Sequence, residues 1–212
     1  MILKIKGDIV SNDMKDIYEW FGYDCTTPGD VLTALEEMPK GDRLQVKINS
    51  GGGDVFAGQE IYSTLRGRND VDIEVEGLAA SAASVIAMAG KSTISPVGML
   101  MIHDVSASYI SGNHAQLSKQ AETLKAWDEA LASAYVEKTG KSKEEIIQMM
   151  DAETWITADK AVELGFIDAI SQAGEPVITN SIGNLKVTDE MIKKYEAKKA
   201  DTEKEKNELL KD

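Results

Sequence analysis

Two strand-to-helix turns follow one another in residues 44–90, LQVKINSGGGDVFAGQEIYSTLRGRNDVDIEVEGLAASAASVIAMAG. Apolar residues alternate over Leu44–Ile48 and recur in Val71–Val75, which is typical of strands. Helical spacing over Val55–Leu65 and small apolar residues over Ala82–Ala89 indicate a helix after each strand. This alternation predicts an α/β fold with parallel strands.

The alternation continues on both sides of that stretch. Before it, we expect one strand and two helices: Ile2–Ile5, Met14–Trp20 and Val31–Met38. Thr27 can cap the second of these helices because Pro28 follows it at the first helical position. After it, we expect a strand, three helices and a closing strand: Val97–Ile102, Ala115–Glu137, Ser142–Met150, Thr157–Leu164 and Phe166–Ile170. The chain is therefore built from repeated strand-helix units.

Composition excludes several classes of protein. A net charge of −13 disfavours a nucleic-acid binder, because such proteins neutralise phosphates with Lys and Arg. One cysteine and two histidines leave little for a transition-metal site, and we expect neither a metal nor a cofactor. No apolar run approaches the roughly 20 residues of a membrane helix, and the N-terminus lacks the pattern of a signal peptide. We therefore expect a cytoplasmic protein with no membrane partner.

The C-terminus differs from the rest of the chain. Residues 181–212 are rich in helix-forming residues, and the segment from Lys186 onward carries equal numbers of basic and acidic residues. Its apolar residues are too sparse for a core-facing stripe. We expect a folded domain over residues 1–180, followed by a charged helical tail that is either solvated or a partner-binding coiled coil.

The glycine-rich turn after the first of the two strands is INSGGGDVFAGQEIY, Ile48–Tyr62. Gly53 and Gly58 have the outer spacing of a phosphate loop, but Gln59 stands where that loop requires lysine. Backbone N–H groups at such a turn can instead bind a carbonyl oxygen and form an oxyanion hole. A plain connecting turn is the structural alternative.

Ser81 follows the second strand, at the expected start of a helix and beside the N–H of Ala82. This position suits a nucleophile, and a helix-capping serine is the alternative. His103 ends an apolar run and is the better of the two histidines for a general base, unless it is a core residue. Asp151 and Glu153 precede Trp155, which we expect to be buried, and either acid could complete a triad.

Together these segments resemble the Clp protease proteolytic subunit family, the ClpP-like serine peptidases. The resemblance covers roughly Leu44 to Ile170 and depends on four motifs: Ile48–Tyr62, Gly77–Ser81, Met101–His103 and Thr157–Asp168. It implies the ClpP/crotonase-like superfold. It also implies that the long helix after Ile110 is the family's protruding handle, through which ring-shaped homo-oligomers stack.

The resemblance implies a serine endopeptidase, a hydrolase that acts on a peptide or protein substrate. Ser81 would be the nucleophile, His103 the general base, and the N–H groups of Gly53 and Ala82 the oxyanion hole. Glu153 stands where the family has its triad aspartate, and Asp151 is the alternative acid. The segment Val105–Gly112 would hold an extended substrate by strand-like pairing.

Departures from the family's pattern refine the expected role. Gly51 replaces a proline, and the 22 residues from Ser81 to His103 are fewer than is usual. Met1–Lys40 does not resemble the segment that engages an unfolding ATPase, so docking to an unfoldase is doubtful. The pattern is similar to phage-encoded head maturation proteases, which process capsid and scaffold proteins inside the prohead. The alternatives are a degradative peptidase that works with an ATPase, a crotonase-like acyl-CoA enzyme, and an assembly protein with a vestigial triad.

Overall fold

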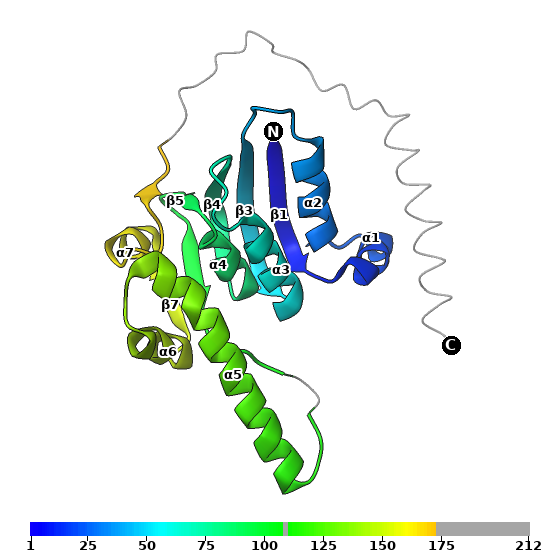
Figure 1. Ribbon diagram of the computed structural model, residues 1–212, viewed down its shortest axis with the longest axis vertical. Helices are drawn as coiled ribbons and strands as arrows, with labels where there is room; N and C mark the ends of the chain where they lie inside the picture. Colours follow the sequence, from blue (N-terminus) through cyan, green and yellow to red (C-terminus); the bar gives the residue numbers. More distant parts are fainter. Residues whose placement is uncertain (108–109, 173–212) are drawn as a thin grey trace, which may run out of the picture. The chain divides into compact units, whose positions relative to one another are not determined.

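The computed structural model describes residues 1–107 and 110–172 (Figure 1). Within these residues, eight strands form one sheet: β1 (Ile2–Ile9), β2 (Cys25–Thr26), β3 (Leu44–Gly53), β4 (Val71–Ala80), β5 (Lys91–Ile94), β6 (Met99–Ile102), β7 (Thr154–Thr157) and β8 (Ala169–Ile170). The order β2-β1-β3-β4-β5-β8 is parallel throughout. β6 pairs parallel with β4, and β7 runs antiparallel to β6. The expected α/β fold with a parallel sheet is confirmed.

In the described part of the chain, seven α-helices connect the strands: α1 (Lys15–Phe21), α2 (Pro28–Glu37), α3 (Val55–Leu65), α4 (Ala82–Ala87), α5 (His114–Thr139), α6 (Lys143–Asp151) and α7 (Ala158–Glu163). A short 3-10 turn, η1 (Asn12–Met14), precedes α1. Thr27 and Ser142 cap their helices through reciprocal capping boxes, as their spacing predicts. The sequence also places Thr157 as the cap of α7, and this prediction is wrong, because Thr157 makes no side-chain capping hydrogen bond.

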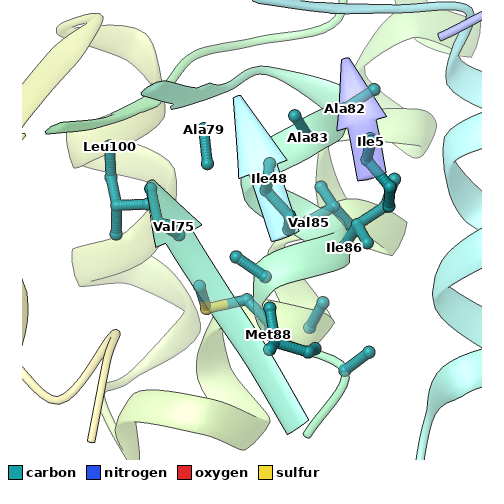
Figure 2. Close-up of a cluster of buried hydrophobic side chains, with 14 of the residues drawn as sticks. Ile5, Ile48, Val75, Ala79, Ala82, Ala83, Val85, Ile86, Met88 and Leu100 are labelled. Carbon is teal, nitrogen blue, oxygen red and sulfur yellow. The ribbon is translucent and has the colours of Figure 1, made fainter. Parts of the chain in front are cut away.

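The core lies between the parallel strands and the helices that connect them (Figure 2). Ile5, Ile48 and Val75 come from three adjacent strands and are fully buried. All six residues of α4 are buried, which its run of alanine, serine, valine and isoleucine permits because small side chains allow close packing. The turn that precedes α4 is therefore continuous with a helix that is packed on all sides.

β3 and β4 are longer than the sequence predicts. The glycines after Ile48 do not end the strand, because Gly52 and Gly53 continue to pair with β1 at Asp8 and Ile9. Neighbouring β4 likewise runs on to Ala80. The two extensions bring the glycine turn and the residues before Ser81 to the same edge of the sheet.

α5 extends away from the sheet (Figure 1). Its first ten residues are exposed, whereas Ala132, Ala134 and Tyr135 in its last turns are buried against the core. No helix among residues 1–107 and 110–172 is long and apolar enough to cross a membrane. The expected domain boundary at residue 180 and the tail at 181–212 lie outside the described residues.

Candidate active site

Ser81 occupies the sharp turn between β4 and α4. Its backbone has φ 53° and ψ −126°, a left-handed conformation that is unfavourable for a residue with a side chain. The turn is fixed on both sides, because the Ser81 N–H donates to Met101 O at 2.9 Å and Ser81 O accepts from Ser84 N at 2.9 Å. Strain of this kind is typical of turns that present a nucleophile.

His103 follows the last residue of β6, which pairs with β4 immediately before Ser81. This pairing brings the two side chains together, and His103 Nε2 lies 2.8 Å from Ser81 Oγ. The distance is that of a hydrogen bond, and the geometry allows the imidazole to accept the hydroxyl proton. The two residues are 22 positions apart in the sequence, and the pairing of β6 with β4 brings them near each other.

The glycine turn lies directly against Ser81. A β-carbon at Gly52 would come within 2.7 Å of both Ala80 O and Ser81 Cβ, so only glycine fits here without displacing the nucleophile turn. Gly52 also has φ 98°, which favours glycine. The backbone at Gly52 therefore approaches Ser81 more closely than it could if any residue with a side chain stood at this position.

A cavity of about 50 Å³ adjoins Ser81 and His103. Gly53 and Ala82, the two residues expected to supply the oxyanion hole, line this cavity together with Ser81 and His103. Val85, Leu131 and Tyr135 give it an apolar side, and its remaining lining residues are Val55, Gly58, Gln59, Asp104, Val105 and Ser106. A substrate side chain could enter beside the nucleophile.

Of the two acids predicted for the triad, Asp151 ends α6 and Glu153 lies in the short loop before β7. Glu153 has φ 47°, and its carboxylate accepts a hydrogen bond from Trp155 Nε1 at 3.3 Å. Within the described residues Glu153 forms no hydrogen bond with His103, and its place in the triad stays a prediction. Trp155 is 51% exposed, so the expectation that it is buried was wrong. Asp151 is the last residue of α6 and interacts with Asp104.

The structure places two further acids beside His103 that the sequence reasoning missed. Asp104 is the next residue in the chain, and burial, followed by the charges of Asp128 and Asp151, raises the pKa of its carboxyl to about 6. Asp128, on α5, accepts a hydrogen bond from Val105 N at 2.6 Å. A signal for Asp128 was present, because it lies four residues after Leu124 and seven before Tyr135, on the same face of the helix.

Among residues 1–107 and 110–172, no group of three His, Cys, Asp or Glu side chains is arranged to hold a metal ion.

Comparison with known proteins agrees with this geometry. Residues 28–174 match the sequence model of the family described as Clp protease. An ATP-dependent Clp protease proteolytic subunit 1 of Streptomyces avermitilis is 36% identical over 138 residues, which are 63% of each chain. A proteolytic subunit 2 of Chlamydia trachomatis is 31% identical over 187 residues, 84% of this chain and 91% of the relative. The match includes the strands and turns that carry Ser81 and His103, and the chain therefore belongs to the Clp protease family of peptidases.

Proposed function

We propose that the protein is a serine endopeptidase in which Ser81 is the nucleophile and His103 the general base. The observation that carries the proposal is the 2.8 Å contact between Ser81 Oγ and His103 Nε2, at a turn whose backbone is strained. A serine that only capped α4 would direct its oxygen to a backbone N–H, and Ser81 makes no such bond. A crotonase-like acyl-CoA enzyme would not need this serine–histidine contact.

In the proposed reaction, Ser81 Oγ attacks the carbonyl carbon of the peptide bond, and its proton passes to His103 Nε2. The N–H groups of Gly53 and Ala82 stabilise the resulting oxyanion. His103 then donates the proton to the leaving amine, and the C–N bond breaks to give an acyl-enzyme. Water, deprotonated by the same imidazole, hydrolyses the ester and releases Ser81.

The substrate would bind as an extended strand along the segment that begins at Val105. Val105 and Ser106 line the cavity beside Ser81, which supports this placement. The same two residues line a second hollow with Phe56 and Trp127, whose ring centroids lie 5.0 Å apart. A peptide bound here would contact α3 and α5 as well as the two sheet-edge turns.

The test is the intact mass after incubation with a fluorophosphonate, compared between the wild type and Ser81→Ala. We expect one adduct in the wild type and none in the variant, because only an activated serine reacts. Ser133→Ala is the matched control and should keep the adduct, since Ser133 is an exposed serine on α5. A wild-type protein that forms no adduct and cleaves no peptide would contradict the proposal.

For the biological role we propose processing of phage capsid or scaffold proteins, carried out by a ring of subunits that associate through α5. The short Ser81–His103 spacing and the charged C-terminal segment support this role. The alternative is degradation of unfolded chains together with an ATPase, and the names of the Streptomyces and Chlamydia relatives favour it. Cleavage of a folded substrate only when a Clp ATPase and ATP are added would favour the alternative.

A further inference from the structure

We propose that the hollow between Phe56 and Trp127 is a second substrate subsite, which takes a large apolar side chain of the bound peptide. That side chain belongs to the residue two positions away from the one whose side chain enters the cavity beside Ser81. The inference rests on the proposed function, because it names the peptides that this active site prefers.

The hollow is continuous with the cavity beside Ser81. Its volume is about 320 Å³, compared with about 50 Å³ for the cavity. Four residues line both spaces: Gly53, Val55, Val105 and Ser106. Gly53 is also a residue whose N–H is proposed for the oxyanion hole. A peptide held at Ser81 therefore lies beside both spaces, and the hollow offers more room for a side chain.

One face of α5 forms the apolar wall of both spaces. Leu124 and Trp127 line the hollow, whereas Leu131 and Tyr135 line the cavity. These four residues follow one another at intervals of three, four and four, which places them on a single stripe of the helix. The wall is therefore continuous over about three helical turns.

The spacing along this wall matches that of an extended peptide. The Val105 N–H donates to Asp128 Oδ1 at 2.6 Å, so the segment proposed to hold the substrate lies against α5. Trp127 and Leu131 are four residues apart, which is about 6 Å along the helix axis. Side chains on one side of an extended strand recur at every second residue, about 6.6 Å apart. A strand-like substrate that runs along α5 therefore directs alternate side chains into the two spaces.

The aromatic pair is a preformed surface. Phe56 is 62% exposed although its side chain is large and apolar. It lies in the first turn of α3, which Asp54 caps by accepting from the Ala57 N–H at 2.7 Å. The half-buried ring of Trp127 meets Phe56 edge to face, at an interplanar angle of 88°. Because both rings are already held in place, little ordering opposes the binding of a side chain between them.

The lining residues favour an apolar side chain over a charged one. Among the described residues that line the hollow, Asp54 alone carries a charge, and its Oδ1 is occupied by the Ala57 N–H. The rings of Phe56 and Trp127 and the side chain of Leu124 supply most of the contact surface. Removing a leucine or phenylalanine side chain from water onto this surface is favourable.

The test uses quenched fluorescent peptides that differ only at the residue two positions from the scissile bond, on one side or the other. Alanine, leucine, phenylalanine and lysine are compared there, and mass spectrometry verifies the bond that is cleaved. The kcat/KM values are measured for the wild type, Phe56→Ala and Tyr23→Ala. Tyr23 is the matched control, because it is an aromatic residue that is 66% exposed and lines neither space.

We expect the wild type to cleave the leucine or phenylalanine peptide with a kcat/KM about 10-fold or more above that of the alanine peptide. Phe56→Ala should reduce this ratio to about threefold or less, because half of the aromatic surface is lost. Tyr23→Ala should keep the ratio of the wild type.

Binding can be followed without turnover in Ser81→Ala. We expect this variant to bind the leucine peptide more tightly than the alanine peptide, with a change in tryptophan emission. Adding Trp127→Phe should remove the change in emission, since the remaining tryptophans, Trp20 and Trp155, do not line the hollow.

Equal kcat/KM values for the alanine, leucine and phenylalanine peptides would overturn the proposal, as would a preference that Phe56→Ala leaves intact. A preference for lysine would also overturn it, because it would assign recognition to the Asp54 carboxylate. If Phe56→Ala changed the sedimenting mass and not the ratio, the hollow would be a contact with a second copy of the chain. Failure of the peptidase function is separate, since it would appear as a wild type without a fluorophosphonate adduct, while the Ser81→Ala binding measurement would still report on the hollow.

Discussion

Gly52 packs so closely against Ser81 that a β-carbon at Gly52 would lie 2.7 Å from Ser81 Cβ. The same β-carbon would approach Ala82 N to 3.0 Å, next to the amide proposed for the oxyanion hole. Gly52 and Ser81 are therefore packed against each other. The space beside Ser81 and the Ala82 amide exists because residue 52 has no side chain.

Gly52→Ala should abolish most of the peptidase activity. The methyl group must displace the nucleophile turn or the glycine turn, and the alanine must also adopt φ 98°. Because misplacement of about 1 Å at a reacting group can reduce the rate by about 100-fold, we expect kcat/KM to fall by at least that factor. Peptide hydrolysis and the rate of fluorophosphonate labelling measure the effect.

Gly51→Ala is the matched control for this prediction. A β-carbon at Gly51 meets no atom within 4 Å. We therefore expect near-normal activity from Gly51→Ala. Equal losses in the two variants would show that general loosening of the glycine turn, rather than the contact with Ser81, determines the result.

A buried hydrogen-bond chain supports the nucleophile from α5. Ser84 Oγ donates to Ser81 O at 2.7 Å and lies 2.7 Å from the hydroxyl of Tyr135, which is almost fully buried. Tyr135→Phe should lower the free energy of unfolding by about 1 kcal/mol, because Ser84 keeps its bond to Ser81. Ser84→Ala should cost more, since it leaves the buried tyrosine hydroxyl without a partner. Denaturant unfolding measures both values.

The double variant tests whether these two residues act as a pair. We expect the loss in Ser84→Ala/Tyr135→Phe to be smaller than the sum of the single losses, because the second change removes a group that the first has already left unpaired. Ser133→Ala, on the exposed side of α5, should change stability by less than about 0.5 kcal/mol. Additive losses would mean that the two hydroxyls do not interact.

Local signals predicted much of this fold, and contacts between distant segments explain what they missed. Thr27 and Ser142 were identifiable because a capping box involves residues only three positions apart. The extension of β3 through Gly53 depends on pairing with Ile9, more than 40 residues away, and no local pattern encodes it. β7 did carry a strand signal in its threonine, tryptophan and isoleucine, but its four residues lie between two helices.

In the candidate site, too, some residues could be predicted from local signals and others depend on contacts between distant segments. Ser81 and His103 each follow a strand, so their position at the sheet edge could be inferred from strand order. The spacing of Asp128 with Leu124 and Tyr135 gave its face of the helix, but the segment that this face contacts could not be inferred, because it depends on how α5 packs against the loop after β6. Asp128 is 25 residues from His103 along the chain, and only the tertiary structure brings them together.

The carboxyl group of Asp104 should make the protein less stable as the pH rises. Its pKa is raised to about 6 in the folded state by burial and by the charges of Asp128 and Asp151, from the ordinary value of 3.8 for an aspartate. Between these two values the folded protein binds more protons than the unfolded chain, so this group's contribution to stability falls with increasing pH. The contribution is fully present below about pH 4 and is lost above about pH 6.

Asp104→Asn removes this titration and keeps the size of the side chain. Relative to the wild type, the variant should gain about 1 kcal/mol of unfolding free energy between pH 4 and pH 7, a value reduced to allow for solvent screening of a half-buried group. Urea unfolding of both proteins across this range measures the difference in unfolding free energy. Carboxyls such as Asp72, whose pKa is lowered by Arg43, contribute equally to both proteins, so their opposite pH dependence cancels in the difference. The unfolding free energy of Asp104→Asn relative to the wild type should therefore increase with pH. A relative value that is constant or decreases would contradict the prediction, because it would mean that the folded protein stabilises the ionised carboxylate of Asp104 despite the charges of Asp128 and Asp151.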